Sequence, residues 1–99
     1  MIMLEHINNI LIDIDKLLEE DKYKLNNINI VKENLQSFKK VLEKNNDVSL
    51  IDLEKVKEVS NLIYDYNTIN FFSTLTDHMS NELYAFEFLL QKELKKKDV

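Results

Sequence analysis

The sequence of 99 residues contains no glycine and no proline. These two residues form most tight turns and most hairpin connections between strands. A fold with many short strands would need many such connections, whereas a bundle of helices needs only a few. Leucine, lysine and glutamate, which favour helices, are abundant instead. The sequence therefore predicts an all-α protein whose loops are built from asparagine, aspartate and serine.

Apolar residues recur at steps of three and four along four stretches of the chain. This spacing places them on one face of a helix. The predicted helices cover residues 2–20, 22–44, 49–66 and 69–96. We expect them to form a compact bundle of four mostly antiparallel helices, in a single helical domain over residues 1–99. The alternative is a long helical hairpin, residues 2–45 against 49–97, that dimerises to bury its second face.

Polar residues mark the expected helix starts. Asp21 is the candidate N-cap of the second helix, because its side chain can accept a bond from a free backbone N–H group. Ser49 is the candidate N-cap of the third, with Asp52 three residues later where negative charge meets the helix dipole. Val48 and Leu53 stand at the two positions of a hydrophobic staple.

Two other stretches predict interruptions. Residues 45–47, Asn-Asn-Asp, form the clearest loop, because their side chains compete with the backbone for hydrogen bonds. Near Asn67 and Thr68 the apolar stripe changes phase, which predicts a break or kink between the third and fourth helices.

The charge balance narrows the classes of partner. The formal net charge is −5, the sequence pI is about 5.0, and every cation is a lysine. Nucleic-acid binding depends on cationic patches, and arginine makes the commonest base-specific contact. Direct binding of DNA or RNA is therefore disfavoured. The abundance of Asn, Ile, Lys and Tyr is typical of AT-rich genomes, such as those of low-GC bacteria and their phages.

The same composition bears on location. No apolar run approaches the roughly 18 residues that a membrane span requires. The first residues lack the basic region of a signal peptide, and the chain has no cysteine for disulfides. We expect a soluble cytoplasmic protein.

Residues 58–91 hold seven of the nine aromatic residues and none of the thirteen lysines. We therefore expect the fourth helix to be central, with the other helices packed around it. Its core-facing line is predicted to consist of Ile69, Phe72, Leu75, Met79, Leu83, Phe86, Leu90 and Leu94. Phe71 and Leu89 would then flank this line, about 100° away, and Tyr84 and Phe88 would point nearly outward.

Outward aromatic rings indicate either a second packing face or an interface with another chain. The acidic residues beside them suit a basic partner, although a solvated polar face is the simpler explanation of them. The predicted partner-binding residues are Phe71, Asp77, Glu82, Tyr84 and Phe88.

His78 and Glu82 are four residues apart and share a helix face, so both could reach one metal ion, with His6 and Glu5 adding ligands from the first helix. Metal sites in bundles normally use Glu-x-x-His pairs, and neither histidine has a glutamate three residues earlier. We therefore predict no metal and no other cofactor.

No catalytic motif is present: the chain lacks cysteine, arginine, a glycine-rich phosphate loop and a nucleophile elbow. The predicted function is a non-catalytic protein-binding module, a small acidic inhibitor, immunity or regulatory factor that masks the surface of a partner protein. The alternatives are a structural homo-oligomer, in the simplest case a homodimer, and a metal- or ligand-binding bundle.

Overall fold

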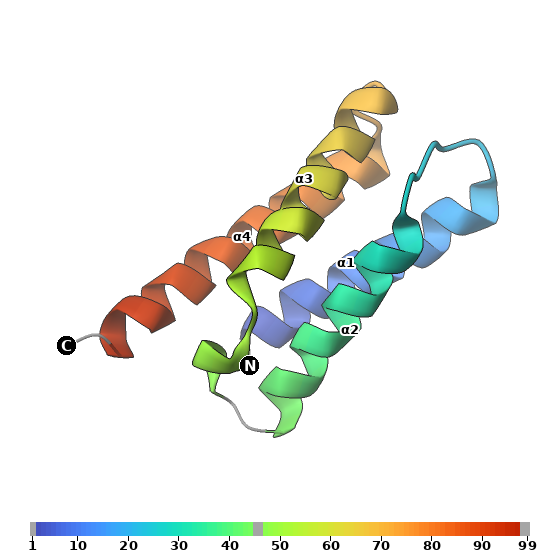
Figure 1. Ribbon diagram of the computed structural model, residues 1–99. Coiled ribbons are helices and arrows are strands. Elements are labelled where there is room, and N and C mark those ends of the chain that lie inside the picture. The colour runs from blue at the N-terminus through green and yellow to red at the C-terminus, as the bar shows by residue number, and fades with distance from the viewer. Residues whose placement is uncertain (1, 45–46, 98–99) are drawn as a thin grey trace.

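The computed structural model of the chain describes residues 2–44 and 47–97. It contains four α-helices, and neighbours along the chain run in opposite directions (Figure 1). A short 3-10 helix, η1 (Val48–Leu50), lies between the second and third of them. The helices are α1 (Ile2–Glu20), α2 (Ile28–Lys44), α3 (Leu53–Ile69) and α4 (Thr74–Lys97). The prediction of an all-α compact bundle of four helices is confirmed.

The helices form a closed ring around one core. α1 contacts α2 and α4, and α3 also contacts α2 and α4. α2 and α4 therefore lie on one diagonal of the ring, and α1 and α3 on the other (Figure 1). The expectation that the other helices pack around a central α4 is wrong. Each helix instead buries one stripe and leaves its opposite side to solvent, in a molecule of 45 × 21 × 21 Å.

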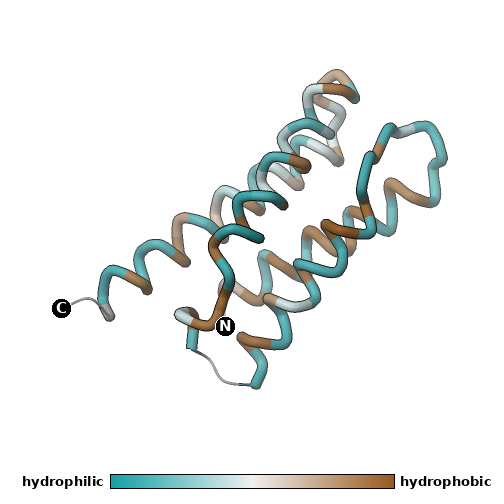
Figure 2. Tube along the Cα trace, viewed as in Figure 1, coloured by the Kyte–Doolittle hydropathy of each residue, from teal (hydrophilic) through white to brown (hydrophobic). Residues whose placement is uncertain are grey.

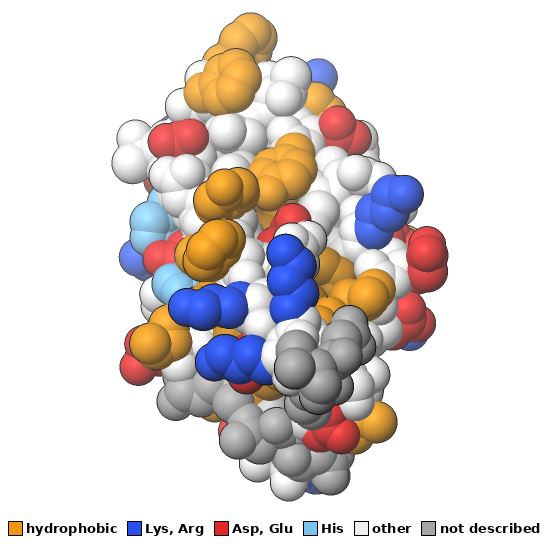
Figure 3. Space-filling model, turned by 90° about the vertical axis from the view of Figure 1, so that its left-hand side faces the viewer, with side chains coloured by type: hydrophobic (Ala, Val, Ile, Leu, Met, Phe, Trp, Pro, Cys, Tyr) orange, Lys and Arg blue, Asp and Glu red, His pale blue; other side chains and the backbone are white. Residues whose placement is uncertain are grey.

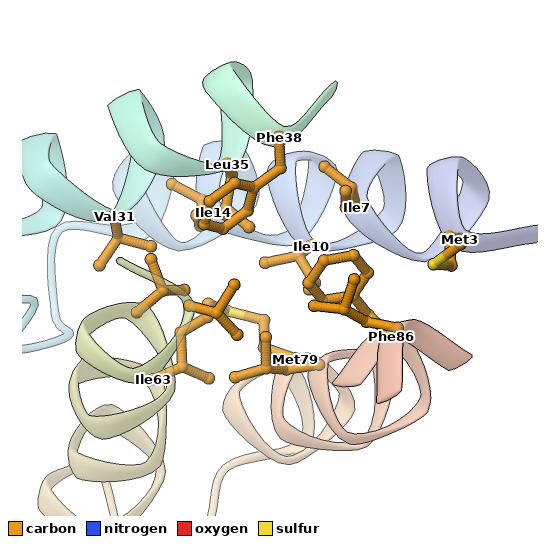
Figure 4. Packing of buried hydrophobic residues seen from close by; sticks show 14 of the residues in the cluster. Met3, Ile7, Ile10, Ile14, Val31, Leu35, Phe38, Ile63, Met79 and Phe86 are labelled. Atoms are coloured by element: carbon orange, nitrogen blue, oxygen red, sulfur yellow. The ribbon is translucent and has the colours of Figure 1, made fainter. Parts of the chain in front are cut away.

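The core consists of the inward stripes of all four helices. Hydrophobic and hydrophilic residues alternate along every helix (Figure 2), and the hydrophobic ones converge between the helices (Figure 4). Phe38 of α2 stacks on Phe86 of α4 across the diagonal, with ring centroids 6.0 Å apart. α1 has the bounds that its sequence predicts, and Ile12, which falls off its apolar face, is exposed.

α2 begins at Ile28, six residues later than predicted. Asp21 is not its N-cap but takes a positive φ of 51° directly after α1. The chain then crosses the end of the bundle, and Asn27, with φ of 58°, accepts the first backbone bonds of α2 from Ile30 and Val31. Aspartate and asparagine tolerate this left-handed conformation better than most residues. The same interruption rules out an unbroken helix over residues 2–45.

α3 begins at Leu53, and its N-cap is Asp52 rather than Ser49. Asp52 accepts a bond from the backbone N–H of Glu54, and Asp47 accepts one from the backbone N–H of Ser49 at the start of η1. The predicted staple is also absent, because Val48 is buried and Leu53 is exposed. Residues 45 and 46 of the predicted loop lie outside the described residues.

The turn between α3 and α4 comes later than the phase change near Asn67 predicts. α3 continues to Ile69, and Phe71 and Phe72 both take positive φ, 57° and 55°. α4 starts only at Thr74. The helical phase is therefore not continuous through the turn, and Ile69 and Phe72 are exposed instead of joining the core-facing line.

Candidate functional site

The outer side of α4 carries two large aromatic side chains that the bundle does not cover. Tyr84 is 68% exposed and Phe88 is 61% exposed. Figure 3 shows hydrophobic side chains running down the face of the molecule on which α4 lies, with lysines toward its lower part. The prediction that Tyr84 and Phe88 point outward agrees with their exposure.

Packing of the inner stripe fixes this orientation. Met79, Leu83 and Phe86 are fully buried on the core side of α4. A helix turns by about 100° per residue, so residue 88 stands about 200° from residue 86 and faces away from the core. Because the inner residues interlock with three other elements, α4 cannot rotate to bury Phe88 without exposing Phe86.

A shallow apolar hollow borders the two rings. Its volume is about 430 Å³, and it is lined by His6 of α1 and by Tyr84, Ala85, Phe88 and Leu89 of α4. Leu89 is half-buried against the core cluster, as expected for a flank position. The exposed rings of Tyr84 and Phe88 therefore border a concave surface that a protruding side chain of another molecule can contact.

Tyr64 extends the aromatic surface onto α3. Partial burial raises the pKa of its phenol above the usual value of 10.0, and the nearby Glu87 carboxylate and Tyr84 hydroxyl raise it further. Glu87 itself accepts a hydrogen bond from the Ser60 hydroxyl of α3. Tyr64 is thus near enough to Tyr84 and Glu87 for their charges to act on its phenol, and the bond between Ser60 and Glu87 joins α3 to α4 at this face.

The five predicted partner-binding residues do not lie together. Asp77, Tyr84 and Phe88 are exposed on the same side of α4. Phe71 is 91% exposed, but it lies at the turn between α3 and α4, before α4 begins at Thr74. It is therefore not part of the outer face of α4. Glu82 is half-buried and is directed toward α1, where it contacts His6.

Glu82 belongs to a network of two carboxylates and two histidines that joins α4 to α1. Its Oε2 lies 2.5 Å from Nδ1 of His6, and its Oε1 lies 3.4 Å from Nε2 of His78. Nδ1 of His78 in turn bonds to the buried carboxylate of Asp13 on α1. The order of contacts is therefore Asp13, His78, Glu82, His6, with the two end members on α1 and the two middle members on α4.

The charge state of this network depends on His78. Its hydrogen bond to Asp13 raises the pKa of the imidazole above 6.5; burial lowers it, the charges of Asp13 and Glu82 raise it, and Lys16 lowers it. Both ring nitrogens face carboxylate oxygens, so the doubly protonated ring satisfies both contacts. Nε2 consequently faces Glu82 and not a hydroxyl nucleophile, which separates this arrangement from a hydrolase triad.

Sequence spacing identified three of these four residues but grouped them as candidate metal ligands. Glu5, the remaining candidate, is exposed and makes no contact with the network. Within residues 2–44 and 47–97, no group of three or more His, Cys, Asp or Glu side chains is arranged to hold a metal ion. Asp13 was missed, although a signal exists: a carboxylate adjoining the buried stripe of α1 needs a partner.

Comparison with known proteins found no matching family model, no matching curated protein and no matching solved structure. No described helix combines the length and the apolar character of a membrane-spanning segment.

Proposed function

We propose that this chain is a non-catalytic protein-binding module that docks through the outer face of α4. The module acts as a small acidic inhibitor, immunity or regulatory factor by covering a surface of its partner. One observation carries the proposal: Tyr84 and Phe88 stand side by side on a rigid helix, each more than half exposed, next to an apolar hollow.

Aromatic side chains bury a large apolar area on binding and lose little conformational entropy. A fully buried aromatic side chain covers about 150–250 Å². Tyr84 and Phe88 are attached to a helix that three other elements already fix in place, so little order has to be gained on binding. Residues of this kind in the centre of an interface typically supply most of the binding energy.

Charge around the rings favours a partner with basic side chains at the end of the face near Asp77. Asp77 is exposed there, and residues 58–91 contain no lysine, while Lys22 and Lys24 lie at the turn beside Phe71. Complementary charge mainly speeds association and selects the correct partner. The lysines at the other end of α4 would meet acidic groups of the same partner.

The carboxylate–histidine network supports a structural role rather than a catalytic one. His6 and His78 are the only histidines, and each has a ring nitrogen in contact with a carboxylate of the neighbouring helix. The network fixes α4 against α1 directly behind the hollow at His6. It thereby holds Tyr84 and Phe88 in the orientation that docking requires.

Photocross-linking in the native host tests this function. A benzophenone side chain is placed at position 88 and, as a matched control, at Ile12, an exposed apolar residue on the outer side of α1 that is 52% exposed. We expect a discrete adduct with one protein from position 88 and none from position 12. A probe at position 84 should give an adduct with the same protein, and Phe88→Asp in that chain should remove it. Identical adduct patterns from positions 88 and 12 would contradict the proposal.

A further inference from the structure

Six exposed residues form a straight stripe on the outer side of α4. They follow one another at steps of four, three, four, three and four, which keeps them within about 40° of one line along the helix. At about 1.5 Å per residue, the stripe is about 27 Å long. Its members, here called the α4 stripe, are Asp77, Asn81, Tyr84, Phe88, Gln91 and Lys95.

The α4 stripe is complementary to itself when it is read from its two ends. An acidic residue at one end matches a basic residue at the other, two amides match inside them, and two aromatic rings match at the centre. The pairs are Asp77 with Lys95, Asn81 with Gln91, and Tyr84 with Phe88. Each pair is centred on the level of residue 86, so a single two-fold axis at that level relates all three.

We propose that the α4 stripe binds the α4 stripe of a second copy of this chain, with the two helices antiparallel. This inference rests on the proposed function, because it names an occupant of the same docking face. Isologous pairing of this kind is the commonest form of homodimer. A foreign partner that docks on the same rings would then compete with the second copy.

The charges select the antiparallel orientation. In an antiparallel pair, Asp77 of each copy lies opposite Lys95 of the other, and the contact occurs twice. A parallel pair would place Asp77 beside Asp77 and Lys95 beside Lys95, which repel. Neither of these two side chains forms an ion pair within the described part of the chain, so both charges are available to a second copy.

The centre of the pair is apolar on both sides. Phe88 of one copy meets Tyr84 of the other, and the hollow beside Ala85 and Leu89 offers space for a ring from the opposing helix. The contact area is confined to one helix and the adjacent Tyr64, which places it at the small end of protein interfaces. We therefore expect a reversible dimer with a dissociation constant on the order of 10–100 μM.

Charge reversal gives a test that only self-pairing passes. Asp77→Lys alone sets Lys against Lys at both ends of the pair, and Lys95→Asp alone sets Asp against Asp. Each variant should dimerise about tenfold more weakly than the wild-type chain. When the two variants are mixed, both ends again join opposite charges, so the mixed pair should form with an affinity within about threefold of wild type.

Sedimentation velocity from about 10 μM to about 500 μM measures these affinities. Glu33→Lys, a reversal at an exposed position of α2, is the control and should leave the wild-type affinity unchanged. Recovery in the mixture also shows that the reversed chains are folded. Wild-type protein that stays monomeric at the highest concentration overturns the inference, and so does a mixture that associates no better than the single variants.

The failure of this inference differs from a failure of the proposed function. If the wild type is monomeric but still cross-links to another protein from position 88, the self-pairing is contradicted and the proposed protein-binding function is supported. Adducts that consist only of two copies of this chain support the self-pairing and remove the foreign partner.

Discussion

The two sides of α4 have similar side chains and opposite surroundings. On the inner side, Met79, Leu83 and Phe86 are fully buried, and Phe86 stacks on Phe38. On the outer side, Tyr84 and Phe88 are mostly exposed. Phe86 and Phe88 are the same residue type only two positions apart. Helical phase, not hydrophobicity, decides which of them stabilises the bundle and which remains free for an interface.

This difference is informative because Tyr84 and Phe88 form a contiguous exposed patch with the neighbouring apolar hollow. Burial of such a side chain contributes about 1.5–3 kcal/mol, which Tyr84 and Phe88 largely forgo in the monomer. Contiguous exposed apolar patches, unlike single exposed apolar residues, mark interaction sites. An interaction is therefore expected on the outer side of α4, and substitutions on the two sides should have different effects.

Phe86→Ala should give the largest effect. It removes a fully buried ring and its stacking contact with Phe38, and such truncations cost about 3–5 kcal/mol. Phe88→Ala, measured by the same urea titration in dilute solution, should change the free energy of unfolding by no more than about 0.5 kcal/mol. Equal losses for the two variants would show that Phe88 belongs to the core.

Phe71→Gly tests whether an exposed aromatic residue outside the α4 stripe contributes to self-association. Phe71 is the most exposed aromatic residue, but it lies at the turn and has a positive φ that costs about 1–2 kcal/mol. Glycine relieves this strain, while its freedom in the unfolded chain offsets part of the gain. We expect a net stabilisation of about 0.5–1 kcal/mol with no change in self-association. A loss of self-association would extend the interface to the turn.

The carboxylate–histidine network between α1 and α4 predicts a small pH dependence of the free energy of unfolding. The pKa of His78 is raised in the folded state. Its stabilising contribution is therefore complete below 6.5 and is lost as the pH rises through the raised pKa. Because His78 is half exposed, solvent screening limits the loss to on the order of 0.5 kcal/mol as the pH rises from about 6 through the raised pKa.

Denaturation of His78→Gln across the same pH range is the matched measurement. The variant keeps His6, Asp13 and Glu82, so the difference in pH dependence between it and the wild type isolates His78. We expect the wild type alone to lose this increment of stability as the pH rises. A wild type that gains stability over the variant with rising pH would have the opposite sign and would contradict the assignment.

Local periodicity in the sequence predicted much of the helical structure. The bounds of α1 and the outward direction of Tyr84 and Phe88 follow from apolar spacing within one helix. The turns were harder, because their left-handed positions are filled by Asp21, Asn27, Phe71 and Phe72. In a chain without glycine, aspartate and asparagine give only a weak signal for such positions, and phenylalanine gives none.

The network between α1 and α4 could be predicted only in part. The spacing of His78 and Glu82 is local, so their shared face was evident. Asp13 is separated from His78 by 65 residues, and the pairing depends on how α1 lies against α4. Residues that bond across two helices leave no periodic signal, and the place of Asp13 beside the apolar stripe of α1 was the only indication in the sequence.

The account depends on the outer side of α4 being an interface, and the oligomeric state of Phe88→Asp tests it most directly. Sedimentation of the wild type, Phe88→Asp and the matched control Ile12→Asp is compared at concentrations up to about 500 μM. The account predicts dimers for the wild type and Ile12→Asp, and a folded monomer for Phe88→Asp. A Phe88→Asp variant that still dimerises as tightly as the wild type would contradict it.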